Sequence, residues 1–182
     1  LFTQVQTNTI KIKKSTNYTF KMNFHNPILQ LYWVIQSNDF YYNKKLKSNY
    51  SSNTDLLTND NNYFELEQIG NPIDTALIEL NGQERMSEQK GSYYNYVQPY
   101  EANSSTPSSG LNVYSFSIHP EEQQPYGSCN FSRLSDTKLQ LNFNKEFINK
   151  LSDNDNLIIK VFALSYNVLR LKSGMAGLAF SF

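Results

Sequence analysis

The chain has 182 residues, of which 39% are hydrophobic, and its 16 basic and 16 acidic side chains leave no net charge. These values fit one domain with a sizeable core, and they exclude the strong positive field on which non-specific nucleic-acid binding depends. No apolar run approaches the roughly 20 residues of a membrane-spanning helix, and the single cysteine, Cys129, excludes an internal disulfide and a cysteine-based zinc site, so a reducing compartment fits best.

Alternating apolar residues predict two strands near the N-terminus. The first runs from Tyr18 to Phe24, with apolar and polar side chains on opposite faces. The second runs from Leu29 to Ile35 and is apolar on both faces, so both can be covered. Pro27 separates the two, at a point where its missing backbone donor is harmless. The segment Ser37 to Asn62 is rich in Asn, Ser, Tyr and Lys, and we interpret it as a long exposed excursion with room for one strand at Phe40 to Tyr42.

The same alternation predicts further strands along the rest of the chain. Ala76 to Leu80 leads into Asn81-Gly82, a dipeptide that favours a tight turn with positive φ. Leu157 to Leu171 is mostly apolar and rich in β-branched residues, so it holds one long strand or two with a bend. The remaining predicted strands are Tyr114 to Ile118, Leu139 to Phe143 and Leu178 to Phe182.

Helix is scarce in this pattern. Asn144 is a candidate N-cap for a helix of about two turns. Three apolar residues would share one face of that helix: Phe147, Ile148 and Leu151. A second short helix or turn is placed within Ser87 to Val97, although Gly91 weakens it.

The predicted fold class is therefore all-β. Aromatic residues, which favour half-buried pleated surfaces, make up 14% of the chain. Ala102 to Gly110, rich in Ser and Thr, is a predicted loop. We expect residues 1–182 to form a single domain, an eight-stranded antiparallel jelly-roll β-sandwich with one or two short helices and long loops.

Tests for catalytic chemistry find no site. His25 and His119 are the only histidines, and the His-Pro-Glu run that starts at His119 matches half of a zinc deaminase signature without its Pro-Cys-x-x-Cys partner. Glu121 and Glu122 are adjacent, so on a strand they would face opposite sides and could not act on one bond. Cys129 is interpreted as a small buried apolar residue. The sequence predicts no catalytic residue, no metal site and no cofactor.

Phosphate and nucleic-acid sites are equally unsupported. Gly174 and Gly177 lack the lysine of a phosphate-binding loop, and we interpret them as permitting a tight turn or close backbone packing between the last two strands. The lysine clusters at residues 11–14 and 44–47 leave nucleic-acid contact as an alternative, but solvated strand edges, which discourage pairing between molecules, are favoured.

Four segments of the chain share a recognisable order of letters. They are NFHNP with YWVIQ (residues 23–36), NGQER with GSYYNYVQPY (81–100), GLNVYSF, PEE and GSCNFSR (110–133), and YNVLRLKSGMAGLAFS (166–181). In this order they resemble the second, C-terminal jelly roll of the major capsid proteins of nucleocytoplasmic large DNA viruses. The order of His25 and Asn26 looks swapped relative to that family.

The resemblance implies a structural virion protein and no enzyme. In that family one polypeptide carries two jelly rolls, three polypeptides form a trimeric pseudo-hexagonal capsomer, and capsomers tile an icosahedral shell. The matched blocks belong to the second roll, so the first roll is expected to be missing from this chain or separated from it. The implied partners are further copies in a homotrimer, neighbouring capsomers and minor capsid proteins. The implied location is the virion capsid, assembled in the host cytoplasm, with neither direct nucleic-acid binding nor embedding in a membrane.

Two Tyr- and Pro-rich segments with little charge are predicted to make contacts between rolls or subunits, namely Gly91 to Gly110 and Pro120 to Arg133. The candidate contact residues within them are Tyr93, Tyr94, Tyr96, Pro99, Tyr100 and Tyr126. The polar segment Ser37 to Asn62 is the candidate outer excursion.

Two alternative functions stay open. One is a single-jelly-roll penton or minor capsid protein. The other is a carbohydrate-binding jelly-roll module, in which the exposed rings of Tyr41, Tyr42 and Tyr50 would stack on sugars, although ordinary loop packing is favoured for them. Of four glycosylation sequons, those at Asn49 and Asn103 lie in predicted loops and are the candidate N-glycosylation sites.

Overall fold

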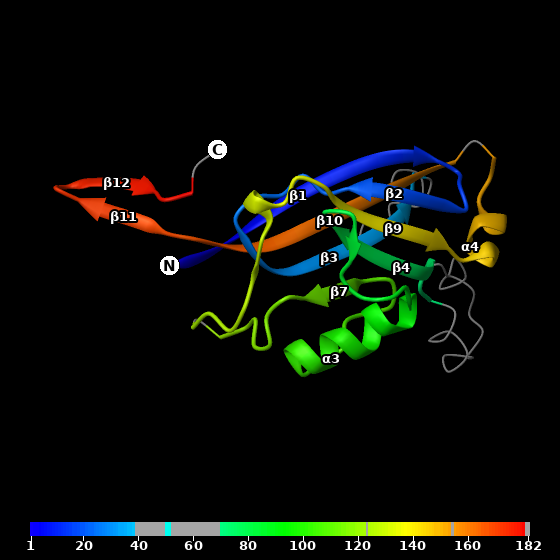
Figure 1. Cartoon of the computed structure of the whole chain (residues 1–182). Coiled ribbons are helices and arrows are strands. Elements are labelled where there is room, and N and C mark those ends of the chain that lie inside the picture. The colour runs from blue at the N-terminus through cyan, green and yellow to red at the C-terminus, as the bar shows by residue number, and fades with distance from the viewer. Residues whose placement is uncertain (39–49, 52–69, 123, 154, 181–182) are drawn as a thin grey trace.

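The computed structural model describes residues 1–38, 50–51, 70–122, 124–153 and 155–180. These residues form two antiparallel sheets that face each other and a separate two-stranded hairpin that extends from one end of the sandwich (Figure 1). The predicted strand at Phe40 to Tyr42, the lysine cluster at 44–47 and most of the predicted excursion lie outside the described residues.

The first sheet contains the two longest strands. Its order is β1 (Phe2–Lys13), β10 (Asn156–Asn167), β3 (Pro27–Ser37) and β7 (Asn112–Ser115), and the short β8 (Cys129–Asn130) also pairs with β3. β1 and β10 pair over 12 residues. β1 was not among the predicted strands, because it lies at the sheet edge and carries mainly Thr, Gln, Asn and Lys. β3 is buried on both faces, as its sequence predicts.

The second sheet packs across from the first. Its order is β2 (Asn17–Lys21), β9 (Thr137–Phe143), β4 (Ile73–Leu80) and β5 (Gln83–Glu84), with β6 (Gln89–Lys90) also paired to β4. Numbered in chain order, the eight strands on the two paths follow 1-8-3-6 in one sheet and 2-7-4-5 in the other. This is a jelly-roll arrangement, so the predicted eight-stranded antiparallel jelly roll is confirmed.

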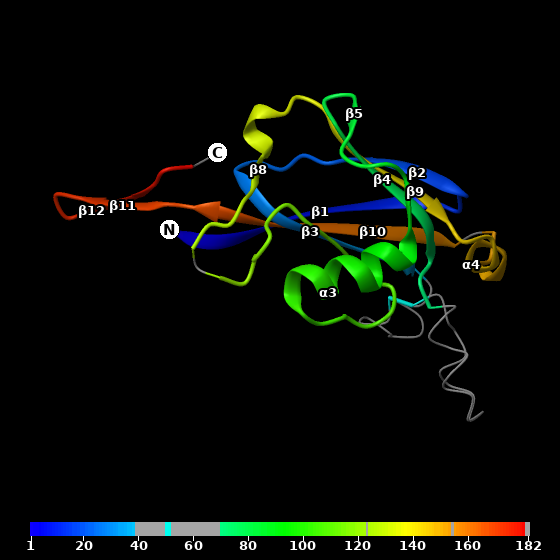
Figure 2. The same ribbon diagram turned by 60° about the horizontal axis from the view of Figure 1, so that its bottom comes forward.

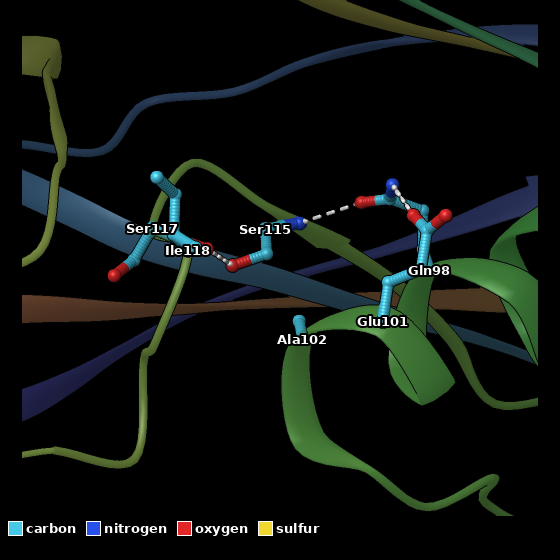
Figure 3. Close-up of a pocket in the computed structure, with 6 residues that line it drawn as sticks. All are labelled: Gln98, Glu101, Ala102, Ser115, Ser117 and Ile118. Atoms are coloured by element: carbon cyan, nitrogen blue, oxygen red, sulfur yellow. Dashed lines mark hydrogen bonds between the residues drawn. The ribbon is translucent and has the colours of Figure 1, made fainter.

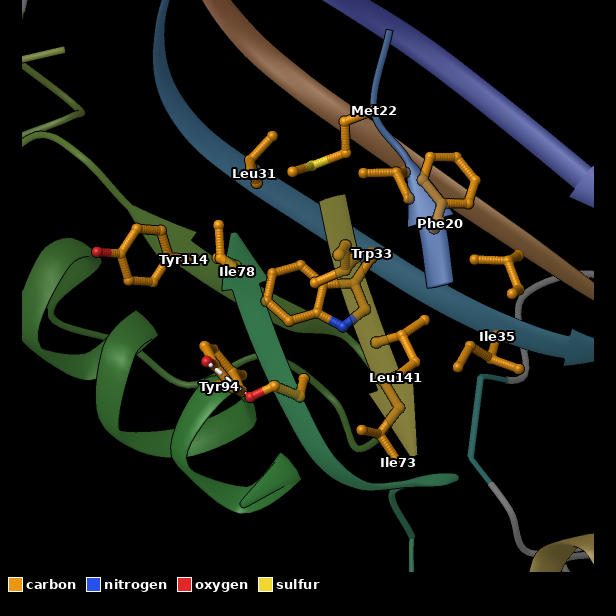
Figure 4. Packing of buried hydrophobic residues seen from close by; sticks show 14 of the residues in the cluster. Phe20, Met22, Leu31, Trp33, Ile35, Ile73, Ile78, Tyr94, Tyr114 and Leu141 are labelled. Atoms are coloured by element: carbon orange, nitrogen blue, oxygen red, sulfur yellow. Dashed lines mark hydrogen bonds between the residues drawn. The ribbon is translucent and has the colours of Figure 1, made fainter. Parts of the chain in front are cut away.

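The core lies between the two sheets, where the longer strands of both contribute alternate side chains. Trp33 at its centre is 0% exposed and lies among residues from both sheets (Figure 4). The fully buried side chains around it include Leu31, Ile35, Ile78, Leu139, Leu141 and Ile159. Burying an aliphatic or aromatic side chain of this size contributes about 1.5–3 kcal/mol, so this cluster is the main source of the domain's stability.

The helices lie at the margins of the sandwich (Figure 2). α4 (Lys145–Lys150) begins where predicted, because the side chain of its N-cap Asn144 accepts a hydrogen bond from the backbone of Glu146 at 2.9 Å. The second predicted helix lies further along the chain than expected. It continues through the π-helical turn η1 (Tyr93–Val97) into α3 (Gln98–Asn103), which takes residues 102 and 103 out of the predicted loop.

Gly91 does not weaken this helical segment, which starts at that residue. A Cβ atom at position 91 would lie 2.2 Å from the backbone oxygen of Ile73. Glycine is therefore required for the close approach of the helical segment to β4.

The stretch Leu157 to Leu171 forms two strands, which is one of the two predicted alternatives. β10 ends at Asn167, and after Val168 the chain forms β11 (Leu169–Lys172), which pairs with β12 (Met175–Leu178). The last strand thus comes earlier than the predicted Leu178 to Phe182. Gly174 permits the tight turn with a φ of 77°, whereas nothing lies within 4 Å of a Cβ at Gly177, so the expected close packing there is wrong.

Candidate functional site

His119, Cys129 and the acidic side chains of the described residues do not converge on one site. Within the described ranges, no group of three or more His, Cys, Asp or Glu side chains is placed to hold a metal ion. The His119 ring packs edge-on against Tyr126, with their centroids 5.2 Å apart. Burial raises the pKa of the Cys129 thiol, and nearby Arg85 opposes this only in part, so Cys129 lacks the activation of a nucleophile. No helix in the described part of the chain is long and apolar enough to span a membrane.

The segment from Tyr93 to Asn103 is fixed to the sandwich by a buried tyrosine. Tyr94 is 0% exposed, and its hydroxyl donates a hydrogen bond to the backbone oxygen of Ala76 on β4 at 3.2 Å. Its ring packs edge-on against Trp33, with a centroid distance of 5.1 Å. Burial raises the pKa of Tyr94 well above its usual value, and neighbouring Tyr114 adds to the shift.

Edge-to-face aromatic contacts extend from Tyr94 along the side of the sandwich. The ring of Tyr94 packs against that of Tyr114. The Tyr114 and Phe116 ring centroids are 5.0 Å apart, and those of Phe116 and Phe131 are 5.8 Å apart. Such pairs contribute about 0.5–1.5 kcal/mol beyond their buried area. This row of rings holds the helical segment and the loop after β7 in a fixed relation to the core.

The six candidate contact residues fall into two groups. Tyr94 and Pro99 are buried and Tyr93 is half-buried, so they support the surface from beneath. Tyr96, Tyr100 and Tyr126 are exposed, and Tyr100 most so, at 66%. Of the six candidates, we therefore expect only these three tyrosines to make direct contacts between rolls or subunits.

A series of side-chain hydrogen bonds joins the end of α3 to β3. Gln30, which is buried, donates to Asn103 at 2.8 Å, and Asn103 donates through Nδ2 to Glu121 at 3.0 Å. The Tyr32 hydroxyl donates to Oε1 of Gln30 at 2.5 Å. Burial, together with the nearby Glu121 carboxylate, raises the pKa of Tyr32. The candidate glycosylation residue Asn103 is therefore the last residue of α3 rather than part of a free loop. Its Nδ2 atom, to which a glycan would be attached, already donates a hydrogen bond to Glu121.

Other predicted site residues lie elsewhere. Asn49, Tyr41 and Tyr42 fall outside the described residues. Tyr50 is half-buried, and its backbone oxygen lies 2.0 Å from where a Cβ of Gly110 would be.

A hollow of about 200 Å³ opens between α3 and the segment after β7 (Figure 3). Gln98 bridges its two sides by accepting a hydrogen bond from the backbone of Ser115 at 3.2 Å. Ile118, which is 72% exposed, stands at the rim on the side opposite Glu101. The backbone of Ile118 donates to the carbonyl oxygen of Tyr126 at 3.2 Å, which brings that tyrosine to the same surface.

We call this surface the aromatic face. It combines exposed apolar side chains with acidic ones, and two of its members, Ile118 and Glu101, line the hollow together with mainly polar residues. Its apolar members are Tyr96, Val97, Tyr100, Ile118 and Tyr126, and its exposed acidic members are Glu101 and Glu121. Exposed apolar patches on soluble proteins mark interaction surfaces, so this set of residues is a candidate contact surface.

Sequence reasoning missed a second exposed apolar group, on the C-terminal hairpin. All eight residues of β11 and β12 are exposed, including Leu169, Leu171, Met175 and Leu178. Their alternation resembles that of a buried strand, so the apolar pattern alone gave no signal that they would face solvent.

Comparison with known proteins gives consistent results. The family model described as large eukaryotic DNA virus major capsid protein matches residues 1–177. The chain is 48% identical over 111 residues to the major capsid protein of Phaeocystis pouchetii virus, covering 61% of this chain and 21% of that protein. It is 32% identical over 191 residues to the major capsid protein of Pyramimonas orientalis virus, covering 92% of this chain and 40% of that protein.

Solved structures agree in fold. The quasi-atomic model of the PBCV-1 virus capsid superposes with a TM-score of 0.74 and 26% identity, covering 99% of this chain and 51% of that one. The Faustovirus major capsid protein superposes with a TM-score of 0.70 at 12% identity, covering 90% of this chain and 32% of that one, which shows the fold alone. The chain thus spans about half, or less, of the length of the proteins that it matches. Because the family model covers nearly all of its residues, the chain belongs to the family of large eukaryotic DNA virus major capsid proteins.

Proposed function

We propose that the chain is a structural part of a viral capsid, where it builds the shell by packing against further copies of itself. The observation that carries this proposal is the superposition of 99% of the chain on half of a capsid protein, at a TM-score of 0.74. The jelly roll suits the task, because long loops are free to make contacts while most strand edges are short or paired.

We further propose that the chain is the second roll of a two-roll capsid protein of an icosahedral virus. Three such polypeptides would form a pseudo-hexagonal capsomer that meets neighbouring capsomers and minor capsid proteins, with assembly in the host cytoplasm. The support is the coverage: the chain accounts for 51% of the PBCV-1 capsid chain and 40% of the Pyramimonas virus protein.

Denaturing mass spectrometry of the native polypeptide in its source particle tests the two-roll proposal. A mass more than twice 21.1 kDa is expected, since a preceding roll adds at least as much again. A mass near 21.1 kDa would overturn it and favour the single-roll penton or minor-component alternative. Absence of the sequence from purified particles would contradict a capsid role altogether.

The aromatic face is the proposed contact surface of this capsid part. Its support is the exposure of Tyr100 on α3 and of Ile118, which lines the hollow together with Glu101. Hydrogen exchange should slow in residues 96–103 and 117–126 when free subunits assemble into capsomers. Equal exchange in both states would contradict this role.

A further inference from the structure

The β11–β12 hairpin has two chemically different faces. In an antiparallel pair, directly opposite residues project to the same side. Leu169 pairs with Leu178 and Leu171 with Ala176, so one face is apolar. On the other face Arg170 is opposite Gly177 and Lys172 is opposite Met175, which makes that face basic. An exposed two-stranded ribbon with one apolar side is incomplete in water and gains stability when that side is covered.

The base of the hairpin is firmly held even though its strands are exposed. Asn167, which is 1% exposed, donates through Nδ2 to Gln4 at 2.9 Å and to the backbone oxygen of Phe180 at 3.0 Å. Its Oδ1 accepts from the backbone nitrogens of Val168 at 2.8 Å and Phe180 at 3.3 Å. One buried amide thus ties β1 to both ends of the hairpin. The hairpin is therefore presented at a defined angle to the sandwich.

The hairpin does not fold back over its own domain. In both Figure 1 and Figure 2 it extends away from the sandwich on the side of the N-terminus, remote from α3. On its apolar face, Leu171 is 76% exposed, Leu169 49% and Leu178 46%. The partner that covers the apolar side must therefore come from outside the described part of the domain.

The aromatic face has the complementary chemistry. It offers exposed apolar side chains, of which Ile118 lies at the hollow, while Glu101 in the hollow and the exposed Glu121 supply negative charge. Arg170 and Lys172 have long side chains that can reach around the narrow ribbon while its leucines pack inward. Apolar surface would thus meet apolar surface, and basic side chains would meet acidic ones.

We propose that the β11–β12 hairpin of one copy docks on the aromatic face of the next copy, with Leu171 at the hollow beside Ile118 and Glu101. This inference rests on the proposed self-assembly of the chain and names its contact. Because the two surfaces lie on different parts of the molecule, the contact is heterologous. A heterologous contact joins copies head to tail and closes into a ring when the rotation fits, as a trimer requires.

Photo-crosslinking tests the contact in the complete capsid polypeptide, purified as capsomers. Benzoylphenylalanine replaces Leu171 on the apolar face in one variant and Met175 on the basic face in the matched control. Capsomers are assembled from mixed ¹⁴N- and ¹⁵N-labelled chains, so that a link between copies joins a light peptide to a heavy one. The Leu171 probe should give light-to-heavy links to residues 96–126, and several-fold more of them than the Met175 probe.

Two other results would overturn the proposal. Links from position 171 that always join peptides of the same isotope, to a segment preceding Leu1, would show that the hairpin clamps its own polypeptide. Intact capsomers with no link from position 171 to residues 96–126 would show that another surface holds them together. In either case the proposed capsid function would survive, whereas failure of the wild-type polypeptide to form capsomers would count against that function itself.

Charge reversal supplies an independent test that does not depend on probe chemistry. The double variant Arg170→Glu/Lys172→Glu should weaken self-association by about tenfold or more, because it places like charges together. Glu101→Lys/Glu121→Lys should do the same, and combining all four changes should restore much of the loss. Sedimentation of chains at matched concentration measures this, with thermal melting as the folding control. Unchanged association in both double variants, or no recovery in the combination, would contradict the docking.

Discussion

Two hairpins in this molecule share a turn but differ in what surrounds them. Asn81 and Gly82, between β4 and β5, have φ values of 52° and 77°, and Ser173 and Gly174, between β11 and β12, have 51° and 77°. Both turns thus have the consecutive positive φ values that match the twist of antiparallel strands. The first is bound to the domain, since Asn81 Oδ1 accepts from the backbone nitrogens of Ser135 and Asp136 at 3.0 and 3.1 Å. The strands of the second are exposed throughout.

The difference separates two causes that a sequence mixes together. A tight turn depends on a few local residues, so it forms in either setting. Burial depends on which surface the strands meet. Ile78 on β4 meets the opposite sheet and is fully buried, whereas Leu171 on β11 meets no such surface within the described domain and stays 76% exposed. Apolar strands with similar side chains are therefore buried in one place and left exposed in the other.

The largest expected effect compares the core with the hairpin directly. Trp33→Ala should lower the free energy of unfolding by about 3–5 kcal/mol, because it leaves a cavity between the sheets. Leu171→Ala should change it by at most about 0.5 kcal/mol in the unassembled chain, since the side chain is exposed. Urea unfolding measures both free energies when it is followed by far-UV circular dichroism, which does not depend on the replaced tryptophan. A cost at Leu171 comparable to that at Trp33 would abolish the distinction.

A matched pair of glycines sharpens the comparison. Gly91→Ala should cost about 2 kcal/mol, because the new methyl group meets the backbone oxygen of Ile73 at 2.2 Å. Gly177→Ala on the hairpin should be near neutral, as nothing lies within 4 Å of its Cβ position. Thermal melting of the two variants beside the wild type tests this. Equal shifts in Tm would mean that the helical segment gives way as easily as the hairpin.

The hairpin base provides a third comparison. Asn167→Ala should lower the free energy of unfolding by about 1–2 kcal/mol, because buried backbone groups lose their partner. Amide exchange should speed up mainly in residues 168–180, while the core strands keep their protection relative to global stability. Hydrogen exchange with mass spectrometry resolves these regions. Uniform acceleration across the domain would show that Asn167 is part of the core rather than the anchor of the hairpin.

The smallest effect comes from the hydroxyl of Tyr94. Tyr94→Phe should cost about 1 kcal/mol near neutral pH through the lost hydrogen bond to Ala76. Because burial raises the pKa of Tyr94 in the folded state, the unfolded chain ionises first as pH rises above about 10, and wild-type stability should then fall. The phenylalanine variant should lose part of this alkaline dependence. Denaturant unfolding between pH 8 and pH 11, taken as rough limits around that value, measures it, and parallel curves for both proteins would contradict the assignment.

Local signals in the sequence predicted much of the fold. The Asn81-Gly82 turn and the Asn144 cap depend on side chains that act on their own backbone, so they can be recognised without a tertiary structure. β1 could not be recognised, because its side chains are polar and what holds it is the backbone pairing with β10, more than 140 residues away in sequence.

The candidate site was harder to predict for a geometric reason. Tyr93, Tyr94 and Tyr96 lie in a π-helical turn, which changes the spacing at which side chains share a face. Three similar tyrosines in four positions thus end up half-buried, buried and exposed. Composition could indicate a contact segment, but only the backbone conformation shows which rings face outward.

The pairing of β1 with β10 also determines when the domain can be completed during synthesis. The sheet partner of the first strand is made only after residue 156 has been added, so the sandwich cannot close on a nascent chain before most of it has left the ribosome. The hairpin follows immediately afterwards. The apolar hairpin therefore emerges after all the core strands have been made, an order that favours burial of the core before the hairpin can cluster with other chains.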